Sequence, residues 1–532
     1  MSLGDTYDFI IVGAGSAGCA LAARLARGQD GTVALVEAGP HDRNPWIHIP
    51  VGYYRTKSSP RLTWGYRTEP EPQLNNRRIN WPRGKVVGGC SSINGLLYIR
   101  GQPEDYDGWA AMGATGWGWS DMLPVFRDME DQERGADSWH GIGGPLGVTD
   151  LKPPHPLMDA YLRAAEAVGS PQNSDFNGAR QEGAGYFQLT LRNGWRCSAA
   201  RAYLYPDRPP NLHVITDMQI ERITMDGRCA TGVQGRRGGQ ETTLTARREV
   251  ILCAGAIGSP QLLELSGIGD TGVLRSAGIE TRVNLPAVGA NLQDHFQVKL
   301  VFRVRSKITI NDILASPFGK VKAALEYALR RRGLMTVGAA QVSVFARVMP
   351  DAVRPDMQIH AMPASSEDPA KGMDPFPAFT SSVSQLRPVS RGNVHVTSPD
   401  PQQHPAIRAN YLDAEYDRSF IVRALRLGRA IAQAEPLAAH ITGEYLPGAK
   451  FATDDELLEA ARSLGSTNYH PVGTCRIGPY GTGVVRPDLK VHGVDRLRVA
   501  DASVMPTLVS GNTNAPSIAI GEKAARLILG RG

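Results

Sequence analysis

Short apolar runs alternate with a helical pattern near the start of the chain. Residues 7–12, Tyr-Asp-Phe-Ile-Ile-Val, form a mostly apolar run that is typical of a buried strand, and residues 32–36 form a second one. Between them Ala20, Leu21 and Leu25 recur at helical spacing. The pattern predicts a strand–helix–strand unit at the N-terminus.

The hydrophobic pattern changes beyond about residue 300. Residues 249–254 still predict a buried strand followed by a helix, whereas the later part mixes strand-like runs at 342–348 and 393–397 with a helical run at 419–434. Residues 497–501 predict one more strand, which returns to the first part of the fold. A chain of 532 residues is long enough for two hydrophobic cores.

A glycine-rich turn joins the first strand to the first helix. Gly13 permits the tight turn, Gly15 lets a pyrophosphate approach the backbone, and Gly18 allows the helix to pack on the strand. The N-terminus of that helix offers free N–H groups to phosphates. Glu37 closes the second strand, where its carboxylate would accept hydrogen bonds from a ribose. The unit predicts dinucleotide binding, and Glu37 argues against NADP but does not separate NAD from FAD.

We therefore predict a mixed fold, α/β in class and α+β overall, with two domains. Residues 1–300 and 491–532 would form a discontinuous Rossmann-like domain, with an excursion around residues 150–195 towards the other domain. Residues 301–490 would form a substrate-binding domain with an antiparallel sheet flanked by helices. Substrate would bind between this sheet and the cofactor, since ligand sites favour domain interfaces.

Charge and cysteine content narrow the functional class. The net charge of +6 is modest, and a solvated helix end explains the basic run Arg330–Arg332 better than nucleic-acid binding. No run of about eighteen apolar residues predicts a transmembrane helix, and no signal-peptide pattern precedes the first strand. Six scattered cysteines predict buried thiols and no metal site. These features favour a cytoplasmic protein and leave peripheral attachment to an inner membrane, and the oligomeric state, open.

Further segments carry motifs rich in glycine and small residues. Residues 81–101 (WPRGKVVGGCSSINGLLYIRG) suit a backbone that lies flat against a ligand, and residues 255–269 (GAIGSPQLLELSGIG) open a helix. Residues 467–478 (TNYHPVGTCRIG) and 511–516 (GNTNAP) lie near the C-terminus. With these motifs the chain resembles the glucose–methanol–choline (GMC) oxidoreductase family over essentially its whole length. Within the family it looks most like the bacterial choline-dehydrogenase-like branch, which includes acceptor-dependent alcohol dehydrogenases.

The resemblance implies FAD as the cofactor and the Rossmann-like domain as an FAD-binding domain. Ile93 stands where some relatives carry a His that is bonded covalently to the flavin, so we expect non-covalent FAD. Ile220, in the strand-like segment 212–223, would present its backbone to the adenine. The residues implied around FAD are Gly13, Gly15, Ser16, Ala17, Glu37, Ala38, Trp64, Arg83, Gly84, Val87, Asn94, Gly95, Leu97, Ile220, Asp501, Ala502, Asn514 and Ala515.

His470 is the predicted catalytic base among twelve histidines. It lies in a Tyr-His-Pro turn in the family's catalytic segment, and a neutral imidazole can take the hydroxyl proton of an alcohol while a hydride goes to flavin N5. Asn514 matches the family's second catalytic position, where its amide would donate to the forming alkoxide. Tyr469 and Gln341 are candidate substrate contacts. Gln341 stands near a position where many relatives carry Glu, which favours a neutral alcohol over a choline-type cation.

These residues predict FAD-dependent oxidation of a primary, neutral alcohol to the aldehyde, with electrons passed to a quinone-like acceptor. An oxygen-using alcohol oxidase of the same family fits the same motifs, because none of them encodes access of oxygen to the flavin. A flavin-containing lyase similar to hydroxynitrile lyases is a further alternative. An NAD dehydrogenase ranks last, because the C-terminal cofactor segment would then have no role.

Overall fold

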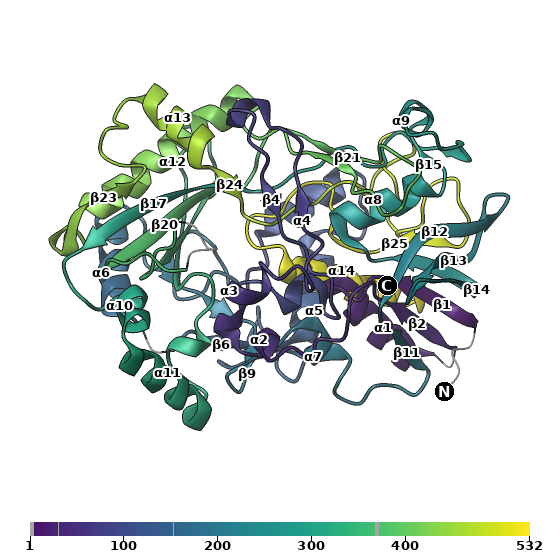
Figure 1. The fold of residues 1–532 in the computed structure, drawn as a ribbon, viewed down its shortest axis with the longest axis horizontal. Helices are drawn as coiled ribbons and strands as arrows, with labels where there is room; N and C mark the ends of the chain where they lie inside the picture. The colour runs from purple at the N-terminus through teal and green to yellow at the C-terminus, as the bar shows by residue number, and fades with distance from the viewer. Residues whose placement is uncertain (1–4, 30, 153, 368–371, 532) are drawn as a thin grey trace.

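Two seven-stranded sheets lie at opposite ends of the long axis of the molecule (Figure 1). The computed structural model describes residues 5–29, 31–152, 154–367 and 372–531. The predicted mixed α/β class is confirmed. Among the described residues, no helix is both long enough and apolar enough to cross a bilayer.

The first sheet contains the strand–helix–strand unit predicted at the N-terminus. Its strand order is β11-β2-β1-β14-β13-β12, and β25 pairs with β14. β1, β2, β11, β14 and β25 pair in parallel, whereas β12, β13 and β14 are antiparallel. The strands are β1 (Thr6–Val12), β2 (Val33–Val36), β11 (Leu212–Ile215), β12 (Met218–Asp226), β13 (Cys229–Arg237), β14 (Gln240–Leu252) and β25 (Leu497–Val499).

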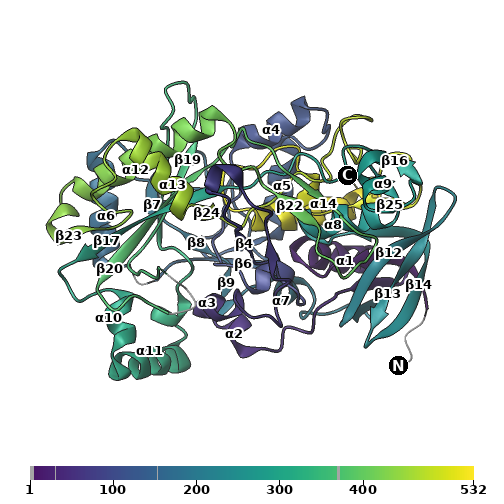
Figure 2. The ribbon, with the colours of Figure 1, turned by 45° about the horizontal axis from the view of Figure 1, so that its top comes forward.

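Helix α1 (Ser16–Gly28) packs against α14 (Asn514–Ile528) beside this sheet (Figure 2). A Cβ atom at Gly18 would lie 2.0 Å from the carbonyl oxygen of Gly13, so a glycine there permits the close contact of helix and turn. The strand-like segment 212–223 is not one strand. It divides into β11 and β12 at Asp217, which has a positive φ of 57°, a backbone conformation that a strand does not contain.

The second sheet is antiparallel, with the order β23-β17-β20-β19-β18-β7 and with β24 paired to β17. β7 comes from the segment around residues 150–195. Helix α12 (Glu415–Gln433) packs on β20, and α6 and α13 pack on α12. The strands are β7 (Gly183–Tyr186), β17 (Phe296–Val304), β18 (Val342–Ala346), β19 (Met357–Met362), β20 (Ala378–Gln385), β23 (Ile441–Leu446) and β24 (Ser466–Thr467).

Strand β20 explains why this sheet forms one wall of a cavity. All eight of its residues are buried, although five of them are polar. Side chains alternate between the faces of a strand, so Phe379 and Val383 enter the hydrophobic core while Thr380 and Ser382 line the cavity. The polar face of the sheet therefore points towards the first sheet.

The remaining elements connect the two sheets and cover them. The helices are α2 (Pro45–His48), α3 (Tyr53–Thr56), α4 (Pro103–Ala111), α5 (Trp119–Met129), α6 (Pro156–Ala167), α7 (Ala199–Tyr203), α8 (Gly255–Leu265), α9 (Thr271–Ser276), α10 (Ile310–Ala315), α11 (Pro317–Arg330) and α13 (Asp454–Leu464), with the short 3-10 helices η1 (Pro50–Gly52), η2 (Pro72–Leu74), η3 (Gly89–Ser92), η4 (Leu334–Thr336), η5 (Ala438–His440) and η6 (Ala502–Val504). The small strands are β3 (Tyr66–Arg67), β4 (Asn80–Trp81), β5 (Glu130–Gln132), β6 (Leu146–Asp150), β8 (Gln188–Leu189), β9 (Leu191–Arg192), β10 (Trp195–Arg196), β15 (Ile268–Gly269), β16 (Val283–Asn284), β21 (Asn393–His395) and β22 (Ala406–Arg408).

Candidate active site

A cavity of about 610 Å³ lies between the two sheets. One wall comes from the glycine turn after β1 and from the N-terminus of α14, and the opposite wall comes from β17, β19 and β20. This volume falls in the range of sites for a cofactor or a drug-sized ligand. Segments from both ends of the chain therefore meet around one site.

The glycine turn forms a cradle that a larger residue would fill. Gly13 has a φ of 104°, and a Cβ atom there would lie 2.4 Å from the carbonyl oxygen of Cys253. Gly89, with a φ of 53°, approaches so closely that its Cβ would lie 2.6 Å from the Cα of Gly15. The N-terminus of α1 opens onto the same space, where its N–H groups can receive phosphate oxygens.

Glu37 lies directly after β2, and its side chain is buried on the cavity wall. Its carboxylate accepts hydrogen bonds from the backbone N–H groups of Ala14 at 3.0 Å and Gly39 at 2.9 Å. Burial raises the pKa of Glu37 to about 7, although these N–H groups and the charge of Lys85 act in the opposite direction. The carboxyl group is thus held in place to accept hydrogen bonds from a ribose.

Most of the residues predicted around the cofactor line this one cavity. Val87 and Ala515 do not line it, and both are buried in the core of the first sheet. Gln341 is also buried away from the cavity wall, and its backbone N–H donates to the carbonyl oxygen of Ala361. The predicted residues on the wall are Gly13, Gly15, Ser16, Ala17, Glu37, Ala38, Trp64, Arg83, Gly84, Asn94, Gly95, Leu97, Ile220, Tyr469, His470, Asp501, Ala502 and Asn514.

His470 lies in a tightly held loop on the cavity wall. The residue before it, Tyr469, has a φ of 69°, and its carbonyl oxygen accepts a hydrogen bond of 2.7 Å from Nη2 of Arg83. Asp294 accepts from the backbone N–H of His470 at 2.7 Å and from the hydroxyl of Thr467 at 2.5 Å. Backbone strain of this kind persists only where neighbouring contacts impose it. The loop therefore fixes the position of the imidazole.

The hydrogen bond between His470 and His295 has a direction that follows from their other contacts. The two Nδ1 atoms lie 2.9 Å apart, and Nε2 of His295 lies 3.1 Å from the carbonyl oxygen of Leu386. Burial lowers the pKa of His295 to about 3, so this ring is neutral, and its single proton sits on Nε2 because a carbonyl can only accept. His470 must then donate from Nδ1, which leaves a lone pair on its Nε2.

His470 is itself neutral. Burial is the largest cause that holds the pKa of His470 well below its ordinary value, and the neighbouring His295 and His360 lower it further. A neutral ring with the lone pair on Nε2 is the form that can accept a proton. The sequence did not indicate His295, because its contact with His470 spans 175 residues of chain.

Asn512, rather than the predicted Asn514, contacts His470. Nδ2 of Asn512 lies 3.2 Å from Nε2 of His470, whereas Oδ1 of Asn514 accepts a hydrogen bond of 3.0 Å from the hydroxyl of Ser16. The reason is the turn before α14: Asn514 is the first helical residue and points to the start of α1, and Asn512 precedes the helix. The sequence indicated no catalytic role for Asn512.

The wall formed by the second sheet carries amines and no carboxylate. Lys299 of β17 and Lys57 both line the cavity, and burial lowers the pKa of each. Among the described residues the acidic side chains on the wall are Glu37 and Asp501. Asp501 caps the other wall, where it accepts from the backbone N–H of Gly255 at 2.9 Å. Two lysines near the substrate side were not predicted from the sequence.

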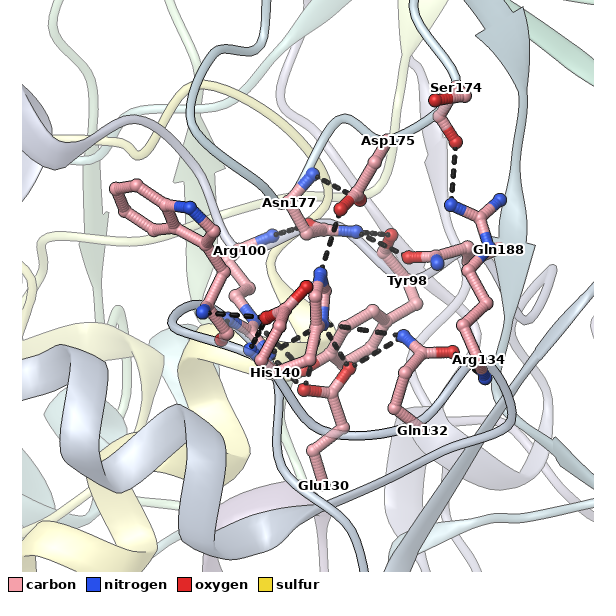
Figure 3. A network of polar contacts seen from close by, with 12 residues as sticks. Tyr98, Arg100, Glu130, Gln132, Arg134, His140, Ser174, Asp175, Asn177 and Gln188 are labelled. Carbon is pink, nitrogen blue, oxygen red and sulfur yellow. Dashed lines mark hydrogen bonds and ion pairs between the residues drawn. The ribbon is translucent and has the colours of Figure 1, made fainter.

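Another buried histidine, His140, lies outside the cavity in a network of charged groups (Figure 3). Its Nε2 lies 2.8 Å from Asp175 and its Nδ1 lies 3.1 Å from Glu130, which also pairs with the fully buried Arg100. Burial alone would lower the pKa of His140, but hydrogen bonds to Asp175 and Glu130 outweigh it and raise the pKa to about 9. This ring is therefore an imidazolium with both N–H groups bound.

The described residues hold no cluster of metal-ligating side chains and no disulfide. No group of three or more His, Cys, Asp or Glu residues in the described part of the chain is arranged to hold a metal ion. All six cysteines are free thiols, of which Cys19, Cys197, Cys253 and Cys475 are buried.

Comparison with known proteins gives matches along nearly the whole chain. The family model described as GMC oxidoreductase matches residues 7–297 with its N-terminal part and residues 388–521 with its C-terminal part. The chain is 41% identical over 529 residues to an alcohol dehydrogenase (acceptor) of Pseudomonas putida, with 98% of this chain and 96% of that protein covered. It is 40% identical over 527 residues to an oxygen-dependent choline dehydrogenase of Rhizobium meliloti (strain 1021), with the same coverage of 98% and 96%. The solved structure of a formate oxidase variant of Aspergillus oryzae RIB40, studied for FAD modification, superposes with a TM-score of 0.91 at 27% identity and covers 99% of both chains.

Proposed function

The chain belongs to the GMC oxidoreductase family, and on this premise we propose that it oxidises a primary, uncharged alcohol to the aldehyde and passes the electrons to a quinone-like acceptor. It is an FAD-dependent enzyme that acts on CH–OH groups, as the motifs predicted. The observation that carries the proposal is the neutral His470, whose Nε2 keeps a lone pair and faces a cavity shared with the glycine cradle.

The residues around Nε2 of His470 have distinct roles in the proposed reaction. His470 accepts the hydroxyl proton of the alcohol at Nε2, while His295 keeps the Nδ1 proton of His470 in place. Asn512, 3.2 Å from the same Nε2, donates its amide N–H to the alkoxide oxygen as charge develops there. When bound, FAD supplies the acceptor for the hydride that leaves the same carbon. In this arrangement the protein contributes orientation and proton transfer.

The cradle fits FAD held without a covalent bond. Gly13 and Gly15 leave room for the pyrophosphate beside the N-terminus of α1, and Glu37 would bind the ribose. Asn514, through its bond to the hydroxyl of Ser16, would support the same end of the cofactor. Ile93 lines the cavity, and its aliphatic side chain has no atom that forms a link to a flavin.

The charge of the substrate side supports an uncharged alcohol over choline. Lys57 and Lys299 line this part of the cavity, and neither offers a counter-charge to a quaternary ammonium, whatever the protonation state of their buried amines. A choline site would gain from a carboxylate or an open aromatic face. The face of Trp64 is covered by Lys85, whose Nζ lies 4.5 Å from the ring centre.

Oxygen is a second candidate for the electron acceptor. It is favoured by two of the similar proteins, one named an oxygen-dependent choline dehydrogenase and the other a formate oxidase. The first similarity, to an alcohol dehydrogenase (acceptor), favours the quinone-like acceptor instead. Oxygen uptake during alcohol turnover, compared with reduction of a quinone analogue under nitrogen, distinguishes the two acceptors.

The substrate proposal is tested by kcat/KM for a series of primary alcohols and for choline, measured with a dye acceptor. We expect choline to be at least about a hundredfold poorer, because the wall formed by the second sheet offers no carboxylate to its charge. Lys299→Gln should narrow that difference, whereas Lys490→Gln, at a half-buried lysine that does not line the cavity, should leave it unchanged. Equal kcat/KM for choline and a primary alcohol in the wild type would contradict the proposal.

A further inference from the structure

Helix α11 exposes an apolar stripe along its whole length. Phe318, Val321, Leu325 and Leu329 follow the spacing i, i+3, i+7 and i+11, which places them on one face of a helix. Their side chains are 78%, 57%, 55% and 80% exposed. Of the fourteen large apolar side chains that are exposed in the described part of the chain, six lie between residues 308 and 329. On most protein surfaces the exposed apolar side chains are scattered singly, whereas here they are clustered on one segment.

The opposite face of α11 already holds the helix to the protein. Ala323 and Tyr327 are its buried residues, and the hydroxyl of Tyr327 donates to the carbonyl oxygen of Gly194 at 3.1 Å. Trp195 packs edge-on against Tyr327, and the Arg331 guanidinium lies 4.5 Å from the centre of the Trp195 ring. Since the inner face satisfies the fold, the apolar stripe has no internal partner. Figures 1 and 2 both show α11 at the rim of the molecule.

Basic side chains lie near both ends of α11: by helical spacing Lys322 borders the stripe, whereas Lys320 and Arg330 lie towards the opposite side of the helix. Lys320, Lys322, Arg330 and Arg332 are exposed, and none of them makes an ion pair within the described residues. Glu326 is the one acidic residue between 317 and 332, and it is half-buried. An exposed apolar face on a helix that carries an excess of lysine and arginine is typical of helices that lie in the interface of an anionic membrane.

We propose that α11 docks the enzyme on an anionic lipid bilayer, with its axis in the plane of the membrane and its apolar stripe among the acyl chains. A second copy of the chain fits this surface less well. A helix of 14 residues is about 21 Å long and about 10 Å wide, so the stripe offers about 200 Å², against about 800 Å² per partner in a stable interface. A twofold contact would also bring the basic side chains of α11 from both copies close together.

Both ends of the segment that contains α11 join the cavity wall. Before it, Asn311 of α10 binds Ser365, with Nδ2 3.0 Å from the carbonyl oxygen of Ser365. After it, the backbone N–H of Ala339 donates to the carbonyl oxygen of Gly95 at 3.0 Å. Ser365, Ala339 and Gly95 all line the cavity. Docking would thus hold the cavity close to the lipid. The docking itself does not depend on the proposed function. Its purpose, delivery of electrons to a quinone dissolved in the lipid, rests on that function.

The test is sedimentation of the FAD-loaded enzyme with vesicles of phosphatidylcholine, with and without phosphatidylglycerol, at low and at high salt. We expect binding to the anionic vesicles that weakens with salt. The double variant Phe318→Ser/Leu329→Ser should lose at least about tenfold in partitioning, because it removes the two most exposed apolar anchors. Lys322→Gln/Arg330→Gln/Arg332→Gln should lose the preference for anionic vesicles. Val353→Ser and Arg423→Gln, exposed residues on other elements, serve as matched controls and should bind like the wild type.

Three outcomes would overturn the docking proposal. One is wild-type enzyme that stays in the supernatant with anionic vesicles at low salt. Another is a Phe318→Ser/Leu329→Ser variant that binds as well as the wild type. The third is a wild-type dimer in light scattering that this double variant makes monomeric, since the occupant of the stripe would then be a second copy. Alcohol oxidation with a water-soluble dye, measured on the same samples, reports the proposed function separately and should be equal in all variants.

Discussion

Two groups of buried histidines lie in opposite electrostatic surroundings. His470 and His295 face each other beside a cavity, with no carboxylate at their ring nitrogens, and burial lowers the pKa of both. His140 lies between the carboxylates of Glu130 and Asp175, which raise its pKa to about 9. Burial by itself acts in the same direction on all three rings. What separates a neutral ring, able to accept a proton, from a charged one is therefore the set of hydrogen-bond partners.

The comparison also separates function from stability. A protonated imidazole that donates both N–H groups to carboxylates is held as part of an ion network and has no lone pair left for chemistry. A neutral ring that keeps a lone pair on the nitrogen facing a cavity contributes little to stability, but it can accept a proton in a reaction. Replacement of each histidine should therefore affect different measurements.

The largest expected effect is the loss of turnover in His470→Ala. We expect kcat with a primary alcohol and a dye acceptor to fall by about 10³- to 10⁴-fold, because the proton acceptor is removed. Flavin content should stay close to that of the wild type. His140→Gln, compared at equal flavin content, should turn over at nearly the wild-type rate. A His140→Gln variant as slow as His470→Ala would contradict the separation between a catalytic His470 and a structural His140.

His140→Gln should instead lower the free energy of unfolding, by about 3 kcal/mol near pH 6. The folded pKa of about 9 lies above the ordinary value of His, so the stabilisation is fully present below the ordinary pKa and is lost as pH rises through about 9. Urea unfolding of both proteins should therefore give a difference that shrinks towards about pH 10. His492→Gln, a half-buried histidine bound to a backbone carbonyl, is the control. A difference that grows with pH would contradict the charged state of His140.

A matched pair of asparagine variants sharpens the account of the cavity. Asn512→Ala should slow flavin reduction by about a hundredfold, as expected for loss of a donor to a developing alkoxide. Asn514→Ala should slow it by less than about tenfold and should release FAD more readily, because its bond is to Ser16. Stopped-flow reduction and flavin retention on gel filtration measure the two effects. If Asn514→Ala instead slowed flavin reduction more than Asn512→Ala, the result would support Asn514 as the donor to the alkoxide.

His295→Gln should slow flavin reduction by about ten- to a hundredfold, which is less than the loss expected for His470→Ala. The amide of Gln can donate to Nδ1 of His470, which would favour the tautomer with its proton on Nε2 and so remove the lone pair. The dissociation constant of the alcohol, obtained from the same stopped-flow data, should hardly change. A weaker alcohol affinity with an unchanged limiting rate would show that His295 only shapes the cavity.

Sequence patterns predicted the parts of the fold that depend on local contacts. The strand, the glycine turn and the helix at residues 7–28 follow one another in the chain, and Glu37 follows the next strand directly, so spacing alone indicates the cradle. His470 was predicted from its turn and motif. In each of these places the neighbouring residues in sequence are also the neighbours in space.

Contacts across long sequence distances could not be predicted in the same way. Asn512 and Asn514 are two residues apart, and only the start of α14 decides which of them turns towards His470. Glu130, His140 and Asp175 belong to three separate segments, and no sequence pattern links them. The basic run at 330–332 predicted a helix end, but the exposed stripe beside it depends on which face of α11 packs on Trp195.

The most direct test of the central claim is the pH dependence of flavin reduction, measured anaerobically by stopped flow with a saturating primary alcohol. Because the pKa of His470 lies well below its ordinary value, the ring is neutral throughout the neutral range, and the rate should stay flat between about pH 6 and 8. A rate that falls about tenfold per pH unit on the acid side of the ordinary histidine pKa would contradict the neutral base. A flavin that no alcohol reduces at any pH would contradict alcohol oxidation itself.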